Sequence, residues 1–499
     1  MKKTAAALTA VFLCLLLLAG CSLPGSGDTA SPTAAPNGAT ASPAATPAPL
    51  SGPGYATVTF ADGSASVAGN GVTVDGSKVT ISAPGEYTFT GTAENGCIVV
   101  NTPGAEDDVK LTLSGVDITN PSGPVILVEQ AKEVDLILAA GTENRLLSGI
   151  EDLVPNSKQE GAVIFSEDDL DIKGEGSLNL YGWLNNGITC KDDLDIKGGT
   201  LTITALNNGI RASESVEISG GEVTVESGGD GIKTTSAKKD GKGFIAVSGG
   251  TVTVTAGGDG LAAESDLSIS DGTVRVTTTG DPERGSCKAL KAKGTLSVSG
   301  GTLLLDSQDH GMRSGTGMVL SGGELTIVSH AGKGILAHGA LTLEAGTLSV
   351  TAETDGIASD TSLTLSGGSV EILAGEDGLK AGSRDYAGGT AVLSGGSFSV
   401  HAGDDPIDAN GGARITGGTF FGVGTSKTPK SFSSGSTQAC VVFEMTAGAG
   451  SVRIESAGAT AGTFEARCPF TYLVYSSPSL APGTCRLVRG TLSAEGQAG

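Results

Sequence analysis

The chain has 499 residues, of which 79 are Gly and only 19 are aromatic (12 Phe, 6 Tyr and 1 Trp). Its formal charge of −23 argues against nucleic acid as a partner, because the phosphate backbone attracts basic surfaces. Abundant Thr, Ser, Val, Ile and Leu favour strands over helices.

Residues 1–20 have the features of a lipoprotein signal peptide. Lys2 and Lys3 give a positive start, and the apolar run at residues 11–18 is too short to span a bilayer. The sequence Leu18-Ala19-Gly20-Cys21 resembles a bacterial lipobox, which implies cleavage before Cys21 and lipidation of its thiol. An ordinary signal peptide with an incidental cysteine is the alternative. We predict a protein held by lipid on the extracellular face of the cell membrane.

Residues 21–54 consist mainly of Ser, Pro, Ala, Thr and Gly. Such a segment buries too little apolar surface to offset its ordering entropy, so we predict a disordered linker. The six cysteines after Cys21 are widely and irregularly spaced, which fits neither a disulfide framework nor a zinc site. Cys468 and Cys485 are the pair to test for a bridge, whereas Cys190 is expected to pack as a small apolar residue.

Two sequence markers recur in phase with a period near 22 residues, which indicates a repeat architecture. The first is a small-residue turn before alternating β residues, as in SGGEVTVE from Ser219 and SGGTVTVT from Ser248. The second is a polar residue, then Gly, then an aliphatic residue, as in Asn208-Gly209-Ile210 and Asp230-Gly231-Ile232. Wider gaps between markers indicate inserted loops of six or seven residues.

Each repeat is predicted to form a coil of three short strands, with aliphatic residues inward and hydroxyl residues outward. One coil cannot bury its apolar side alone, but a stack can. We therefore predict an all-β parallel β-helix of about ten regular coils. The helix is expected over residues 151–424, with an N-terminal β cap and irregular first coils over 55–150 and a C-terminal β cap over 425–499.

The polar residue of the second marker is expected to form a row along the stack. Carboxylates about 5 Å apart repel each other unless a cation lies between them, and calcium binds about six to eight oxygens in adaptable geometry. The alternative is that these residues only satisfy turn backbone. We predict two calcium sites, a lower one at Asn208, Asp230 and Asp259 and an upper one at Asp355, Asp377, Asp404 and Asp405.

Outward positions three residues beyond the polar marker are often basic. Together with the acidic row they could hold a uronate chain, although singly they could merely neutralise neighbouring Asp. Loss of Lys2 and Lys3 with the signal changes the charge from −23 to −25, so binding of a polyanion should depend on a divalent cation. The predicted ligand-binding residues are Arg211, Lys233, Lys291, Arg313 and Lys380.

The sequence resembles a known family in three places. These are the segment from Asn144 through Ser166-Glu167-Asp168-Asp169-Leu170-Asp171-Ile172-Lys173, the coils that follow it, and Ser476-Ser477-Pro478. Its members are bacterial surface β-helix proteins described as carbohydrate-binding, with affinity for acid sugars and cellulose. The resemblance implies a right-handed, pectate-lyase-like parallel β-helix that binds calcium and is not established as catalytic.

Three functions are compatible with these observations. The first is calcium-assisted, non-catalytic binding of an acidic polysaccharide such as polygalacturonate by a monomeric surface lipoprotein. The second is a calcium-dependent polysaccharide lyase, which needs a base beside a bound uronate. The third is a structural adhesin or spacer that binds no specific glycan. Tyr181 and Trp183 lie in one coil and could form a local sugar subsite or pack in a core or cap.

Overall fold

The computed structural model describes residues 53–61, 63–149, 161–237, 241–433 and 435–499. The predicted signal peptide, the lipidation site at Cys21 and the linker up to residue 52 lie outside these ranges. The secondary-structure elements found in the described ranges are β-strands. No helix in these ranges is long and apolar enough to cross a bilayer.

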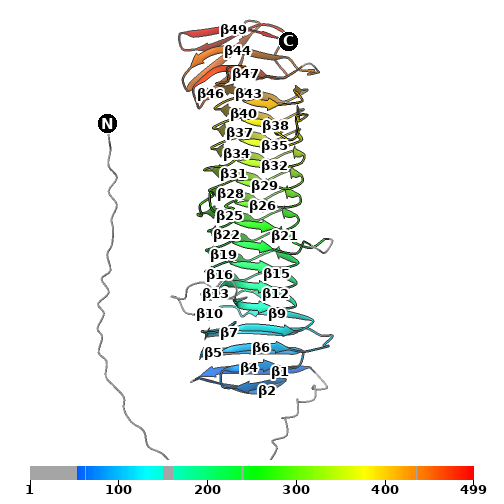
Figure 1. Cartoon of the computed structure of the whole chain (residues 1–499), viewed down its shortest axis with the longest axis vertical. Coiled ribbons are helices and arrows are strands. Elements are labelled where there is room, and N and C mark those ends of the chain that lie inside the picture. Colours follow the sequence, from blue (N-terminus) through cyan, green and yellow to red (C-terminus); the bar gives the residue numbers. More distant parts are fainter. Residues whose placement is uncertain (1–52, 62, 150–160, 238–240, 434) are drawn as a thin grey trace, which may run out of the picture. The chain divides into compact units, whose positions relative to one another are not determined.

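Successive coils stack as parallel strands (Figure 1). In a representative coil, β17 (Ile210–Ala212), β18 (Ser215–Ile218) and β19 (Glu222–Ser227) form three sides. Each pairs in parallel with its counterpart one coil further on. The prediction of three strands per coil is therefore confirmed. The three counterparts are β20 (Ile232–Thr234), β21 (Phe244–Val247) and β22 (Thr251–Ala256).

Alternation along each strand builds the core. In β19, Val223 and Val225 are buried, whereas Glu222 and Glu226 are exposed. Val223 stacks in register on Val252 of the next coil, and full burial of such a side chain contributes about 1.5–3 kcal/mol. The same pattern in each coil produces one continuous hydrophobic cluster through the stack.

Glycines at both sequence markers have identifiable structural reasons. Gly221, in the small-residue turn, has a φ of +81°, a conformation that residues with a Cβ rarely adopt. Gly231, in the polar marker, approaches the next coil so closely that a Cβ would lie 2.2 Å from Val254 Cγ1. In the coil that contains both Gly174 and Gly176, the positive φ occurs at Gly174.

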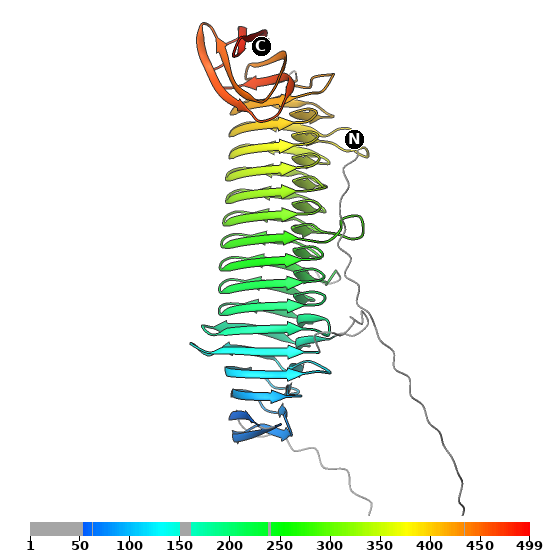
Figure 2. The same cartoon turned by 90° about the vertical axis from the view of Figure 1, so that its left-hand side faces the viewer.

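The solenoid extends further toward the N-terminus than the regular repeat. One sheet contains 15 described strands, of which β3 (Val72–Asp75) pairs antiparallel with β4 (Lys78–Ile81). The 14 strands from β4 to β41 (Ile407–Ala409) contribute one strand per turn, which gives about 14 turns. A loop over residues 279–289, between β25 (Thr273–Thr278) and β26 (Leu290–Ala292), projects from the stack (Figure 2).

Antiparallel strands cover both ends of the stack. At the start, β1 (Gly54–Ala61) pairs with β2 (Ser64–Asn70). At the other end, β43 (Thr419–Gly424) pairs antiparallel with β47 (Phe470–Ser476) above a second hydrophobic cluster. These strands protect the terminal coils from pairing with other chains.

The described cysteines are free thiols. Cys468 and Cys485 form no bridge in this structure, although they were the pair most worth testing. Cys190 is fully buried in the main hydrophobic cluster, as its place in the repeat predicts. Burial raises the pKa of its thiol to about 12, so Cys190 is an apolar core residue rather than a nucleophile.

Candidate functional site

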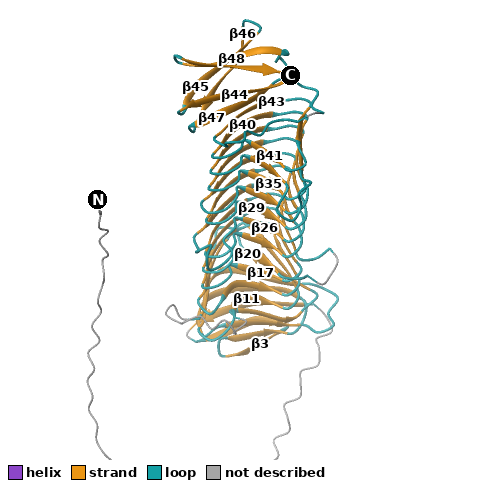
Figure 3. Ribbon diagram, turned by 45° about the horizontal axis from the view of Figure 1, so that its top comes forward, coloured by secondary structure: helices purple, strands orange, loops and turns teal. Residues whose placement is uncertain are grey.

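The predicted basic residues form a row on the outward side of one sheet. Register places Arg211 of β17 beside Lys233 of β20, and Lys291 of β26 beside Arg313 of β29 (Met312–Ser314). Lys380 of β38 (Leu379–Ala381) lies in the same row, beside Asp408 of β41. Figure 3 shows the strands of this sheet stacked one coil above another. Residues that recur with the sequence period therefore lie in a row on one face of the solenoid.

The polar residues of the second marker form a parallel row with a specific backbone role. Asn208 Oδ1 accepts a hydrogen bond of 3.1 Å from the amide of Asp230. Asp230 Oδ1 in turn accepts one of 2.8 Å from the amide of Asp259, one coil further on. The Asp and Asn side chains therefore satisfy turn backbone, which was the alternative to metal binding.

At the lower predicted metal site, lysines already neutralise the remaining carboxylate oxygens. Lys233 Nζ lies 2.7 Å from Asp230 Oδ2, and Lys291 Nζ lies 2.6 Å from Asp259 Oδ2. Asn208, Asp230 and Asp259 are thus neighbours along the row, but a cation would have to displace two ammonium groups. Arg211, by contrast, has no ion-pair partner among the described residues.

The middle of the polar row is cationic rather than acidic. Lys288 pairs with Asp309, and Lys333 pairs with the fully buried Asp355. Between them, His310 Nδ1 accepts a hydrogen bond of 2.9 Å from the Lys333 amide. Burial lowers the pKa of His310 to about 4, so the imidazole is neutral at pH 7.

The upper predicted metal site brings three carboxylates together. Oxygens of Asp377, Asp404 and Asp405 lie within 4.8 Å of one another. Burial raises the pKa of the Asp377 carboxyl, and the neighbouring Lys380 ammonium only partly opposes this shift. Asp404 is exposed. The predicted fourth ligand, Asp355, is outside this group and is held instead by Lys333 and Lys380.

The oxygens of this upper cluster differ in availability. Asp405 Oδ1 accepts hydrogen bonds from the Tyr472 hydroxyl and from the Lys430 amide. Asp377 Oδ2 lies 2.9 Å from Lys380 Nζ. The carboxylate of Asp404 makes no hydrogen bond or ion pair with a described residue. Carboxylate oxygens are suitable ligands for calcium, and Asp404 offers the most accessible ones.

A second acidic group was not anticipated. Glu133, Asp135 and Asp171 lie on the outward side of β9 (Glu133–Leu138) and β12 (Asp169–Gly174), and Asp135 is in register with Asp171. Lys173 Nζ lies 2.5 Å from Asp135 Oδ1, and Lys197 pairs with Asp171. The Asp-Leu-Asp-Ile-Lys sequences at Asp169 and Asp193 were the available signal, because alternation places both Asp on one side.

A hydrogen-bonded row of Arg313, His338 and Asp360 was also missed. Arg313 Nη2 lies 2.8 Å from His338 Nε2, and His338 Nδ1 lies 2.7 Å from Asp360 Oδ2. The guanidinium can only donate, so Nε2 accepts from Arg313 and the Nδ1–H donates to Asp360. No sequence marker contains His338, so its alignment with Arg313 became visible only with the coil register.

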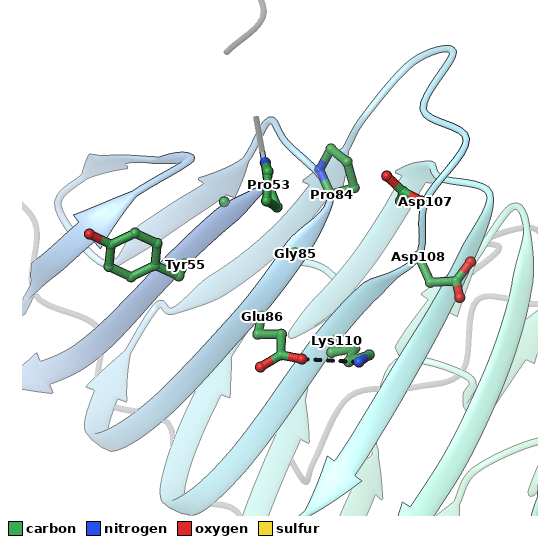
Figure 4. A pocket seen from close by; sticks show the side chains of 9 residues that line it. Pro53, Tyr55, Pro84, Gly85, Glu86, Asp107, Asp108 and Lys110 are labelled. Atoms are coloured by element: carbon green, nitrogen blue, oxygen red, sulfur yellow. Dashed lines mark hydrogen bonds and ion pairs between the residues drawn. The ribbon is translucent and has the colours of Figure 1, made fainter. Parts of the chain in front are cut away.

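A hollow of about 480 Å³ lies beside the N-terminal cap (Figure 4). Tyr55, which is 65% exposed, stands on one side, with Glu86 and Lys110 on the other. Glu86 Oε1 and Lys110 Nζ form an ion pair of 3.0 Å. Lys132 neutralises Asp108 at 2.8 Å, so most charges around the hollow are already compensated.

Comparison with known proteins places the chain in a family. The family model described as "Carbohydrate-binding domain-containing protein" matches residues 75–332 and 318–463. The chain belongs to this family. Both matched regions together include the whole polar row from Asn186 to Asp405.

Two known proteins are similar in sequence to this carbohydrate-binding domain-containing protein. A carbohydrate-binding domain-containing protein of Acetivibrio thermocellus is 39% identical over 140 residues, which are 27% of this chain and 48% of that relative. The match therefore spans about half the length of the relative. A solved polysaccharide lyase-like protein from C. thermocellum, a gadolinium derivative, is 34% identical with a TM-score of 0.45. The alignment covers 49% of this chain and 96% of that one.

Proposed function

We propose that this carbohydrate-binding domain-containing protein binds acidic polysaccharide with calcium assistance and without cleaving it. One observation carries the proposal. In this chain, which belongs to the carbohydrate-binding family, a row of cationic side chains lies beside a row of carboxylates along one sheet. Arg211 and Lys380 mark the two ends of the basic row. Uronate carboxylates would bind the cations directly and would share calcium with the acidic cluster.

The upper cluster of Asp377, Asp404 and Asp405 is the favoured calcium site. Its three carboxylates lie close together, and the row of ammonium groups does not reach Asp404. Calcium at the lower site would compete with Lys233 and Lys291, so we expect weaker affinity there. Bound calcium would reduce the repulsion between a polyanion and a chain of formal charge −23.

Titration of the purified protein with polygalacturonate, with calcium or with a chelator, tests this function. We expect saturable binding that weakens strongly when calcium is removed. Asp404→Asn should lower calcium affinity without loss of thermal stability, because this exposed carboxylate supports no described contact. Glu353→Gln, a change at an exposed acid two coils below, is the matched control and should bind calcium normally. Absence of polygalacturonate affinity with or without calcium would refute the proposal.

A polysaccharide lyase is the second candidate, favoured by the Arg313–His338–Asp360 row. A uronate carboxylate that engaged Arg313 would withdraw this donor from His338 Nε2. The freed nitrogen could then take the C5 proton while the bond from C4 to the leaving oxygen breaks, the C4–C5 double bond forms and water protonates that oxygen. Asp360 would orient the ring and stabilise the imidazolium.

Ultraviolet absorbance of unsaturated uronides distinguishes a lyase from a binder. A lyase that uses this row would lose product formation in His338→Ala but not in His330→Ala. His330 is a matched control because it also pairs with an aspartate, Asp306, at 2.7 Å. If the wild-type protein binds polygalacturonate and releases no unsaturated product, the non-catalytic function stands.

Lipidation of Cys21 would place this binding surface on the extracellular face of the cell membrane. Cys21 and the linker that follows it lie outside the described residues. The support is the lipobox-like sequence that ends at Cys21. Metabolic labelling with a fatty-acid analogue tests this proposal, and Cys21→Ser should abolish the label. An unlabelled wild-type protein would contradict it.

A further inference from the structure

Tyr181 and Trp183 lie on the outside of the solenoid, in a regular coil. Alternation along β13 (Ser177–Gly182) directs Tyr181 outward, and Trp183 follows the strand directly, while Gly182 between them is buried. Their ring centroids are 6.3 Å apart, with an angle of 31° between the planes. Both side chains are half-buried, and neither ring belongs to one of the two hydrophobic clusters. Packing in a core or cap formed by the described residues therefore does not account for this aromatic pair.

A cation and polar groups from the neighbouring coil border the pair. The Arg145 guanidinium of β10 (Glu143–Ser148) lies 5.1 Å from the centre of the Tyr181 ring. Arg145 Nη1 binds Asp117 at 2.9 Å, and both of these side chains are substantially exposed. Asn179, in register with Arg145, donates a hydrogen bond of 3.1 Å to Glu143. The guanidinium thus has remaining donors beside an aromatic surface.

The outward side of this sheet continues as a surface of hydroxyl groups. Thr204 of β16 (Thr200–Ala205) is in register with Tyr181, and Thr202 is in register with Asn179. Their hydroxyls make no hydrogen bond with a described residue. An extended glycan that begins at the aromatic pair would therefore meet free hydroxyl groups on the next coil.

We infer that Tyr181, Trp183 and Arg145 form a subsite for one uronate residue of an acidic polysaccharide. The apolar C–H face of the sugar ring would pack on the accessible part of the aromatic pair, since aromatic rings offer a large apolar surface. The uronate carboxylate would accept charge-assisted hydrogen bonds from Arg145. This subsite lies on a different sheet from the basic row, and the inference depends on the proposed binding of acidic glycan.

Trp183 is the only tryptophan of the chain, so its fluorescence reports on this subsite alone. We expect a saturable fluorescence change when the purified protein is titrated with oligogalacturonate in calcium buffer. A neutral galacto-oligosaccharide of equal length should bind at least about tenfold more weakly, because it cannot engage Arg145. Arg145→Gln should remove this preference for the acidic ligand. Arg275→Gln, at an outward position of β25 in the same sheet, is the matched control and should preserve it.

Parallel co-sedimentation with polygalacturonate separates this subsite from the proposed function. Co-sedimentation without any fluorescence change would overturn the subsite and leave polysaccharide binding intact. Equal responses to the acidic and neutral oligosaccharides would overturn the uronate assignment. If the protein neither co-sediments nor changes fluorescence, the proposed function and the subsite both fail. Tyr181→Ala, with thermal melting as a check on folding, should weaken the fluorescence response of a correctly folded protein.

Discussion

The charge balance at Lys380 gives a direct test of how the acidic row is stabilised. Lys380 Nζ lies 2.9 Å from Asp377 Oδ2 and 3.2 Å from Asp355 Oδ1. The Asp377 side chain is only 6% exposed, and Asp355 keeps a second cation in Lys333. Lys380→Met removes the charge while it preserves most of the apolar stem. Asp377 then remains buried without its ammonium partner.

We expect this substitution to lower the free energy of unfolding by about 3–5 kcal/mol. This is the usual cost of removing one partner of a buried ion pair and leaving the other charge buried without compensation. The loss should be largest at neutral pH. Burial already raises the pKa of Asp377, and loss of the ammonium raises it further. Because a raised carboxyl pKa costs stability as pH rises, the difference from wild type should shrink in acid as Asp377 becomes protonated.

Urea denaturation of the wild-type and variant proteins at several pH values measures this effect. Lys293→Met is the control, since Lys293 pairs with Glu264 but is 58% exposed; we expect a loss of at most about 1 kcal/mol. Calcium should restore part of the stability of Lys380→Met if the upper cluster binds it. Equal, small losses in the two variants would refute the charge-compensation argument.

Two further predictions concern His401, a solenoid residue that contacts the C-terminal cap at Arg467, and the coil spacing. Burial lowers the pKa of His401 to about 4, so the unfolded chain gains its proton first as pH falls below about 6.5, and stability should drop by up to about 3 kcal/mol by pH 4. His401→Gln should flatten this acid dependence in calorimetry; parallel profiles for the two proteins would contradict the reasoning. Gly231→Ala should cost about 1–3 kcal/mol in chemical denaturation through overpacking against Val254. Gly285→Ala, where a Cβ would meet nothing within 4 Å, should be neutral; an equally large loss there would exclude the steric explanation.

The sequence predicted the stack well because a solenoid converts a period into a spatial neighbour. Marker spacing aligned Ile210 with Ile232 and Arg211 with Lys233, and the strand register confirms these pairings. The recurrence of Gly231 and its equivalents was visible in the sequence, and the structure gives its reason, since the same close approach recurs in each described coil that carries the Gly of this marker. The irregular first coils were harder to delimit because their strands pair with the same topology at looser spacing.

The details of the candidate site depended on contacts that spacing does not specify. A one-dimensional row of Asp residues does not reveal that Lys233 reaches its neighbour Asp230 or that Asp355 is fully enclosed. These contacts depend on side-chain rotamers and on how neighbouring coils pack against each other. Likewise, register places Arg313 beside Leu336, and spacing does not specify that its guanidinium reaches His338 two residues further on.

In the coils where Asn or Asp occupies the polar marker, its side chain accepts a hydrogen bond from the turn amide of the next coil, and this arrangement has an evolutionary consequence. Asn208 accepts from Asp230, and Asp230 accepts from Asp259. Above the lysines in the middle of the row, Asp377 accepts from Asp405, which in turn accepts from the Lys430 amide and the Tyr472 hydroxyl of the cap. Deleting or duplicating one complete circuit leaves donor and acceptor matched at the new junction. Insertion or deletion of only part of a coil would instead move every later residue onto a different side of the solenoid. Solenoids of this kind can therefore gain or lose whole coils while the caps at both ends stay unchanged.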